Sequence, residues 1–183
     1  MSRRFVLLDR DGTINQEVGY VLRPDELRLI PGAADALREL RDLGLGLVVL
    51  TNQSPIGRGM LSVDELGTIH ERLSELLAAD GVTLDGIEFC PHRPDEGCAC
   101  RKPAQGMALR AAARLGFDPA RSVVVGDHTS DMGMGRAIGA TTVLVRTGHG
   151  RAQEDEAAPL ATHVADDLAG AVAIIAGLPA PEG

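Results

Sequence analysis

The two carboxylates of Asp9 and Asp11 stand in the string DRDGT, directly after the apolar run FVLL. Two carboxylates at this spacing, after a buried strand, can reach one cation and one substrate. Asp-Gly is also a common turn signal, so a plain loop is the competing interpretation. The complete five-residue string at the end of an apolar strand favours the functional interpretation, which predicts a metal-assisted reaction on a small substrate.

Polar side chains follow two further apolar runs in the same way. Thr51 and Asn52 come after residues 45–50, and Asp127 comes after residues 122–126. In open parallel sheets, ligands bind beyond the carboxyl ends of the strands. The sequence therefore predicts that these side chains meet Asp9 and Asp11 at one edge of a sheet.

Cys90, His92, Cys98 and Cys100 form a second group with chemical potential. Three thiolates and one imidazole suit tetrahedral Zn²⁺, and four protein ligands make a closed, structural site. A lone cysteine is more often a small apolar core residue, but the clustering of all three cysteines with one histidine argues against that alternative. We expect the zinc loop, about residues 90–100, to aim Arg101 and the following lysine at the active site.

The elements that must position these residues alternate along the chain. Apolar strands separated by helices indicate an α/β fold, a doubly wound parallel sheet with helices on both faces. Ser62 and Glu65 predict a capping box at the start of one helix. The expected strands are 3–8, 45–50, 86–90, 122–126, 142–145 and an edge strand at 162–165; the expected helices are 32–43, one from Ser62, one after the cysteines, 131–138 and a last one ending near 176, with an acidic connector before the edge strand.

Length and charge limit the class of protein. The 183 residues suit a single domain, 1–183, with a frayed tail at about 178–183. We find no apolar stretch long enough to cross a bilayer and no signal peptide, so we expect a cytoplasmic protein, and a monomer. The net charge of −8 argues against nucleic acid or membrane partners. Binding of an anionic substrate then requires local positive charge, and the chain's single lysine, Lys102, directly follows the cysteine segment.

The strings at the strand ends resemble the motifs of the haloacid dehalogenase superfamily. Its first motif matches DRDGT, Thr51 matches the second, Lys102 the third, and the acidic string GDHTSD (residues 126–131) the fourth. The match spans roughly residues 5–150. The resemblance implies a Rossmann-like phosphatase fold without a large cap domain.

The resemblance also implies the role of each matching residue. Asp9 is the expected nucleophile, which forms an aspartyl phosphate. Asp11 is the expected general acid and base, a role that favours a raised pKa. Thr51 and Lys102 are expected to bind and neutralise the phosphoryl group. A catalytic Mg²⁺ is expected on Asp9, the backbone carbonyl of Asp11, and Asp127.

The cysteine loop, followed by Arg-Lys-Pro, resembles the branch that contains heptose bisphosphate phosphatases and histidinol-phosphate phosphatases. Three strings favour the heptose branch: GYV (19–21), TNQS (51–54) and VRTG (145–148). The expected activity is removal of the 7-phosphate from D-glycero-D-manno-heptose 1,7-bisphosphate, a phosphorylated sugar. The residues expected to bind substrate are Glu17, Val18, Gly19, Tyr20, Asn52, Gln53, Ser54, Arg58, Arg101 and His128.

Two alternatives remain beside this hypothesis. The first is hydrolysis of histidinol phosphate or another small phosphate monoester. The second is a catalytically inactive, zinc-stapled binding module. His128 stands where the heptose branch usually has a lysine, so a fixed charge becomes a titratable one. Asp131 is open to two roles, the orientation of Lys102 or of a metal-bound water, and the sequence leaves the preferred anomer undecided.

Overall fold

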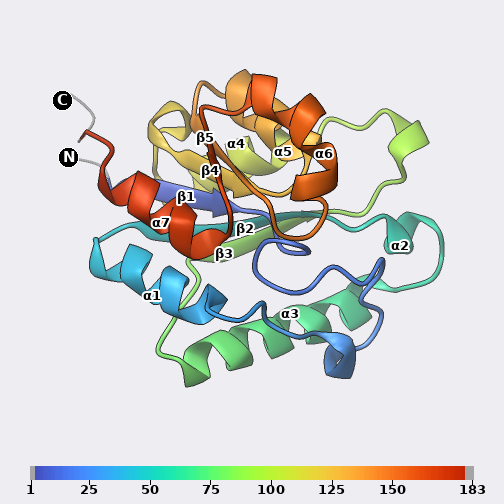
Figure 1. The fold of residues 1–183 in the computed structure, drawn as a ribbon. Helices are drawn as coiled ribbons and strands as arrows, with labels where there is room; N and C mark the ends of the chain where they lie inside the picture. Colours follow the sequence, from blue (N-terminus) through green and yellow to red (C-terminus); the bar gives the residue numbers. More distant parts are fainter. Residues whose placement is uncertain (1–2, 180–183) are drawn as a thin grey trace.

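The computed structural model describes residues 3–179. Its centre is one sheet of six parallel strands in the order β3-β2-β1-β4-β5-β6 (Figure 1). The predicted α/β class with a doubly wound parallel sheet is confirmed. The strands are β1 Phe5–Leu8, β2 Gly46–Asn52, β3 Gly86–Cys90, β4 Val123–Gly126, β5 Thr141–Val145 and β6 His163–Ala165.

β1 and β4 are apolar along their whole length, and β2 is apolar up to Thr51, because both faces of these strands are covered. β1 pairs with β2 on one side, with Val6 opposite Leu47, and with β4 on the other, with Val6 opposite Val123. All four residues of β1 and of β4 are buried. The carboxyl ends of these three strands therefore lie side by side, which brings their following loops together.

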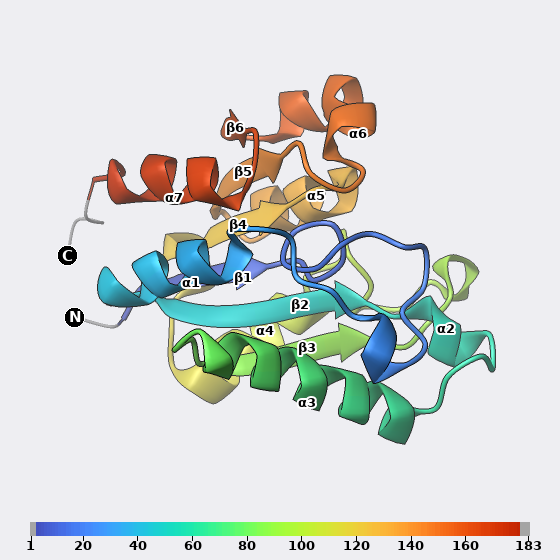
Figure 2. The ribbon, with the colours of Figure 1, turned by 60° about the horizontal axis from the view of Figure 1, so that its bottom comes forward.

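Helices cover the two faces of the sheet in two groups (Figures 1 and 2). α1, α3 and α7 pack with Val6, Leu8 and Leu47 in one core, while α4 and α5 pack with Phe5 and Leu7 in another. The helices are α1 Ala33–Asp42, α2 Ser54–Gly57, α3 Val63–Ala79, α4 Gly106–Leu115, α5 Thr129–Ala137, α6 Gly150–Ala157 and α7 Leu168–Ala176, with single 3-10 turns at Pro24–Glu26, Pro94–Glu96, Pro119–Arg121 and Ala158–Leu160.

The predicted capping box is confirmed: Ser62 Oγ accepts a hydrogen bond from Glu65 N, and the Glu65 carboxylate accepts one from Ser62 N. The expectation of a connector without a helix before the edge strand is wrong, since this segment contains α6. The acidic residues of this segment suggested a solvated connector. In the structure one of them, Glu154, forms an ion pair with Arg146 at 2.7 Å and so attaches the helix to the end of β5. The predicted frayed tail falls mostly outside the described residues. Between residues 3 and 179, the structure contains no helix with the length and apolarity needed to span a membrane.

His70 on α3 gives a prediction about stability. Its Nε2 atom is buried with no hydrogen-bond partner, and burial, followed by the charge of Arg10, lowers the pKa of His70 to about 4 from its ordinary value of 6.5. Below pH 6.5 the unfolded chain binds a proton that the folded protein does not, so this part of the stability is lost as the pH falls from 6.5 towards 4.

Replacement His70→Leu should therefore make unfolding less sensitive to acid. We expect the variant to match the wild type at pH 7, and to exceed its free energy of unfolding by about 1–2 kcal/mol at pH 5. Urea denaturation at the two pH values measures this difference. An equal loss of stability on acidification in both proteins would contradict the assignment.

Candidate active site

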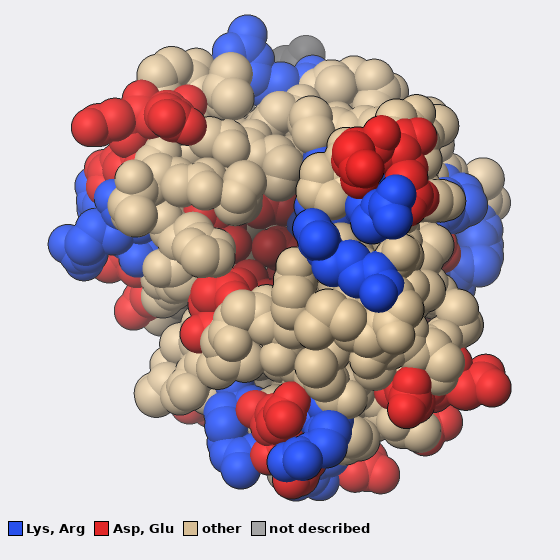
Figure 3. Space-filling view, turned by 90° about the vertical axis from the view of Figure 1, so that its right-hand side faces the viewer, with Lys and Arg blue, Asp and Glu red and all other residues tan. Residues whose placement is uncertain are grey.

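Residues from five separate segments line one cavity of about 250 Å³ at the carboxyl edge of the sheet. Asp9 follows β1, Thr51 is near the end of β2, and Asp127 follows β4. Lys102 comes from the segment after the cysteines. Figure 3 shows acidic atoms in the depth of a hollow, with basic atoms on one part of its rim. The cavity thus combines carboxylates with local positive charge, as the sequence predicts for an anionic substrate.

Three carboxylates crowd together in this cavity. Ligand atoms of Asp9, Asp127 and Asp131 all lie within 4.8 Å of one another. Burial raises the pKa of Asp127, and the negative charges of Asp9 and Asp131 raise it further. Burial and Asp9 also raise the pKa of Asp131. Buried like charges of this kind call for a cation, and a hard divalent ion such as Mg²⁺ fits an all-oxygen donor set.

Two glycines and one amide form a cradle around Asp127. His149 N donates to Asp127 Oδ2 at 2.7 Å. A Cβ atom at Gly12 would lie 2.0 Å from Asp127 Oδ2, and one at Gly148 would lie 2.1 Å from it. Both glycines also have positive φ, +82° and +54°. The carboxylate fits only because both neighbours lack a side chain, and Thr147 Oγ1 ties the two loops together by donating to Gly12 O at 2.6 Å.

The side-chain ammonium of Lys102 has three partners within the protein. Its Nζ atom lies 2.7 Å from Asp9 Oδ1, 2.7 Å from Asp131 Oδ1 and 2.7 Å from Leu50 O. Burial lowers the pKa of Lys102, but the charges of Asp131 and Asp9 raise it by more, so the ammonium stays protonated. Both oxygens of Asp131 are occupied, since Oδ2 accepts from His128 N. Of the two roles open to Asp131, this geometry favours the orientation of Lys102.

Asn52 joins the end of β2 to the backbone of Lys102. Its Oδ1 accepts from Lys102 N at 3.0 Å, and its Nδ2 donates to Lys102 O at 3.3 Å. These two bonds hold the backbone of Lys102 against the end of β2.

Pro55, three residues after Asn52, is compatible with the helix because it lies in the first turn of α2, where a backbone N–H has no helical acceptor.

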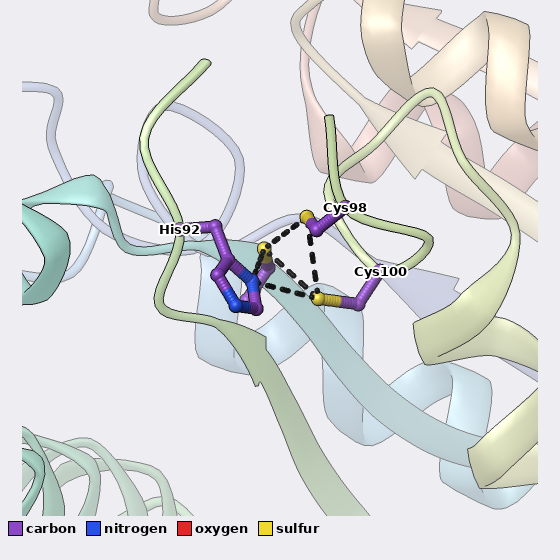
Figure 4. Close-up of side chains that lie close together, drawn as sticks. His92, Cys98 and Cys100 are labelled. Atoms are coloured by element: carbon purple, nitrogen blue, oxygen red, sulfur yellow. Dashed lines mark hydrogen bonds between the residues drawn. The ribbon is translucent and has the colours of Figure 1, made fainter. Parts of the chain in front are cut away.

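The four predicted zinc ligands come together beside this cavity (Figure 4). Cys90 Sγ lies 3.1 Å from Cys100 Sγ and 3.5 Å from Cys98 Sγ, and His92 Nδ1 lies 3.3 Å from Cys100 Sγ. A tetrahedral zinc with Zn–S bonds of about 2.3 Å separates its sulfurs by about 3.8 Å, so a small outward shift accommodates the ion. Burial raises the pKa of Cys90, so zinc binding at this thiol would release a proton.

Most of the residues expected to bind substrate line the cavity, and Val18 does not. Val18 is 54% exposed, and it lies in the loop that Glu17 closes by accepting from Gly19 N. His128 keeps its Nδ1 as acceptor for Ser130 N, which leaves the proton on Nε2, and burial lowers its pKa. The predicted residues that line the cavity are Glu17, Gly19, Tyr20, Asn52, Gln53, Ser54, Arg58, Arg101 and His128.

The cavity also includes His149, which is not among the residues predicted from the sequence. Its Nε2 lies 3.6 Å from Glu17 Oε2, across the cavity mouth. The sequence contains a feature that could have predicted this: Gly-His-Gly follows β5, so His149 lies at the same edge of the sheet as Asp9. Val21, Pro94 and Ser130 also line the cavity and were not predicted.

The parallel sheet, the carboxylate cluster at its edge and the buried lysine define a phosphatase of the haloacid dehalogenase type. A family model described as HAD-hydrolase-like matches residues 99–171. A D-glycero-beta-D-manno-heptose-1,7-bisphosphate 7-phosphatase of Yersinia pestis is 47% identical, with 84% of this chain and 86% of the relative covered. A D-glycero-D-manno-heptose-1,7-bisphosphate 7-phosphatase of Thermosynechococcus vestitus is 43% identical, with 94% and 95% covered.

A solved structure extends this likeness to three dimensions. The D,D-heptose 1,7-bisphosphate phosphatase of B. bronchiseptica, in complex with magnesium and phosphate, has a TM-score of 0.88 and 37% identity, with 94% of this chain and 98% of that chain covered. The chain therefore belongs to the family of heptose-1,7-bisphosphate 7-phosphatases within the haloacid dehalogenase-like hydrolases. The predicted enzyme class, a magnesium-dependent phosphoric monoester hydrolase, is confirmed.

Proposed function

We propose that this enzyme removes the 7-phosphate from D-glycero-D-manno-heptose 1,7-bisphosphate, with Asp9 as the nucleophile. The observation that supports this most strongly is the approach of Lys102 Nζ to Asp9 Oδ1, at 2.7 Å, which joins residues 93 positions apart at the strand ends. Relatives at 43–47% identity carry this activity in their names.

In the first step, a carboxylate oxygen of Asp9 attacks phosphorus and the bond from phosphorus to the sugar oxygen breaks. Asp9 Oδ1 accepts from Arg10 N and from Lys102 Nζ. Among the described residues no protein donor reaches Oδ2, so we assign the attack to that oxygen. The proton of Asp11 passes to the leaving oxygen, and Lys102 and Thr51 stabilise the charge on the transferring group.

In the second step, water attacks the phosphorus of the aspartyl phosphate. Asp11 now takes a proton from the water, the bond between Asp9 and phosphorus breaks, and inorganic phosphate leaves. Asp9, the backbone carbonyl of Asp11, and Asp127 would hold Mg²⁺. When bound, the ion neutralises charge between the anionic nucleophile and the anionic phosphate.

We further propose that Cys90, His92, Cys98 and Cys100 hold a structural Zn²⁺. The loop that these residues close carries Arg101, whose N–H donates to Cys98 Sγ at 3.3 Å and whose Nη1 donates to His92 O at 3.2 Å. Lys102 follows directly. A rigid loop would therefore hold both cations at the cavity.

Loss of one thiolate should empty the zinc site. We expect about one zinc per wild-type chain by elemental analysis and little in Cys98→Ser, which should also lose about tenfold in kcat/KM because Arg101 and Lys102 are less well held. Removal of zinc from the wild type by a chelator, and its return, should reproduce and then reverse the loss. A zinc-free wild type with full activity would contradict the proposal.

The substrate proposal is tested by comparing kcat/KM for the heptose 1,7-bisphosphate with kcat/KM for histidinol phosphate, the two substrates considered for this branch. In the presence of Mg²⁺ we expect kcat/KM for the heptose 1,7-bisphosphate to exceed that for histidinol phosphate by at least about 100-fold, since the cavity rim presents Arg58 and Arg101 to a second phosphate. The reverse preference would support the histidinol-phosphate alternative. No turnover of any phosphate monoester would support the inactive binding module.

A further inference from the structure

The carboxylate of Asp11 is held by more donors than a loop carboxylate requires. Arg10 donates from Nε at 3.2 Å and from Nη2 at 2.9 Å to Oδ1, and Nη2 also lies 2.9 Å from Oδ2. Asn15 Nδ2 donates to Oδ1 at 2.8 Å. Gln53 Nε2 donates to Oδ2 at 3.0 Å. Both oxygens are thus fixed in one orientation by residues of the protein.

Arg10, which makes three of these contacts, is itself buried, and burial of its charge costs free energy unless an anion pairs with it. The guanidinium is 0% exposed, and its Nη1 atom has no hydrogen-bond partner. A buried cation requires a nearby anion, and Asp11 is the carboxylate that pairs with it in the structure. The pair therefore ties the Asp11 side chain to a fixed charge beneath the cavity.

Gln53 supplies the contact from the neighbouring strand. Its Nε2 atom donates both to Asp11 Oδ2 and to Thr51 Oγ1, the latter at 2.8 Å. An amide nitrogen has two protons, so both donors are used within the protein. The residue is 3% exposed, and its backbone N–H donates to Cys90 O at 2.7 Å. Its side chain therefore has no N–H left for a phosphate oxygen, although sequence resemblance implies that Gln53 binds substrate.

We infer that Gln53 is a positioning residue, which fixes Asp11 for proton transfer to the leaving oxygen and holds it in register with Thr51. This inference rests on the proposed function, in which Asp11 is the general acid. When the phosphorus–oxygen bond breaks, its electron pair goes to the leaving oxygen and the proton of Asp11 follows. The contacts seen in the structure are those of the Asp11 carboxylate, the form that remains after this transfer and that takes the proton from water in the second step; the donors from Arg10, Asn15 and Gln53 stabilise its negative charge.

A substrate-binding role and a positioning role predict different dependence on the leaving group. An alkyl alkoxide is a poor leaving group that needs its proton, whereas p-nitrophenolate leaves without one. In Gln53→Met, which keeps the length and removes both donors, we expect kcat/KM to fall about 10–100-fold for an alkyl phosphate such as the heptose bisphosphate. For p-nitrophenyl phosphate we expect a loss of less than about threefold.

Asp11→Asn provides the reference, since it removes the acid itself and should show a larger difference between the two substrates. In the Asp11→Asn background, Gln53→Met should add no further leaving-group dependence, because the group that it positions is gone. An equal loss on both substrates in Gln53→Met, or a loss that persists in full in the double variant, would overturn the inference. If Gln53→Met does not fold, Gln53→Leu removes the same donors without adding charge beside Asp11.

Failure of the inference is distinguishable from failure of the proposed function. A wild-type enzyme that hydrolyses both phosphates, together with equal losses in Gln53→Met, contradicts the role of Gln53 alone. A wild-type enzyme that hydrolyses neither phosphate contradicts the proposed function.

Discussion

Replacement Asp9→Asn should reduce kcat/KM for every phosphate monoester by at least about 10³-fold. The amide keeps the shape of the side chain but is not a nucleophile, so no aspartyl phosphate forms. The substitution also removes one of the two carboxylates, those of Asp9 and Asp127, that are expected to hold Mg²⁺. Steady-state kinetics with saturating Mg²⁺ measures the loss, and an activity within tenfold of the wild type would exclude Asp9 as the nucleophile.

The same variant should remain folded, which separates lost chemistry from lost structure. Asp9 contributes to the raised pKa of both Asp127 and Asp131 through repulsion, and Lys102 keeps its contact with Asp131 when Asp9 is neutral. We therefore expect Asp9→Asn to be at least as stable as the wild type in thermal unfolding with EDTA. Asp118→Asn is a matched control at an exposed cap distant from the cavity, and it should keep full activity.

Replacement Gly148→Ala should weaken Mg²⁺ binding by more than about tenfold. A Cβ atom at this position would lie 2.1 Å from Asp127 Oδ2 and 2.5 Å from Gly12 Cα, so the carboxylate has to move. The loss follows from the proposed role of Asp127 as a magnesium ligand. Calorimetric titration of the variant with Mg²⁺ measures the affinity directly, and the concentration of Mg²⁺ for half-maximal activity should rise in parallel.

Gly81→Ala is the matched control for this experiment. Gly81 has a positive φ of +78°, but a Cβ atom there would meet nothing within 4 Å. This variant carries the backbone strain without the collision, at a cost of about 1 kcal/mol in stability. We expect it to bind Mg²⁺ as the wild type does. Equal affinities in Gly148→Ala and the wild type would show that the cradle does not position Asp127.

The types of residue along the chain are enough to predict several strands and much of the candidate site of this protein. The buried strands are continuous apolar runs, so β1 and β4 are predictable, and the residue types at their ends restrict the reaction to metal-assisted chemistry on an anion. The cluster of Cys90, His92, Cys98 and Cys100, which we propose to bind zinc, follows from four possible ligands within residues 90–100, since a short loop can bring them together. Helix α6 was missed because its acidic surface lacks an apolar stripe, and its fit depends on the pairing of Glu154 with Arg146.

Only the tertiary structure decided how the site is held. The contact of Lys102 with Asp9 and Asp131, the tether from Gln53 to Asp11, and the cradle of Gly148 around Asp127 all join segments from different strands. Such contacts depend on strand order and on distances of tenths of an ångström, which no local spacing encodes. A sequence specifies which chemical groups are present; the packing of the sheet sets which of them touch the substrate and which hold the others in place.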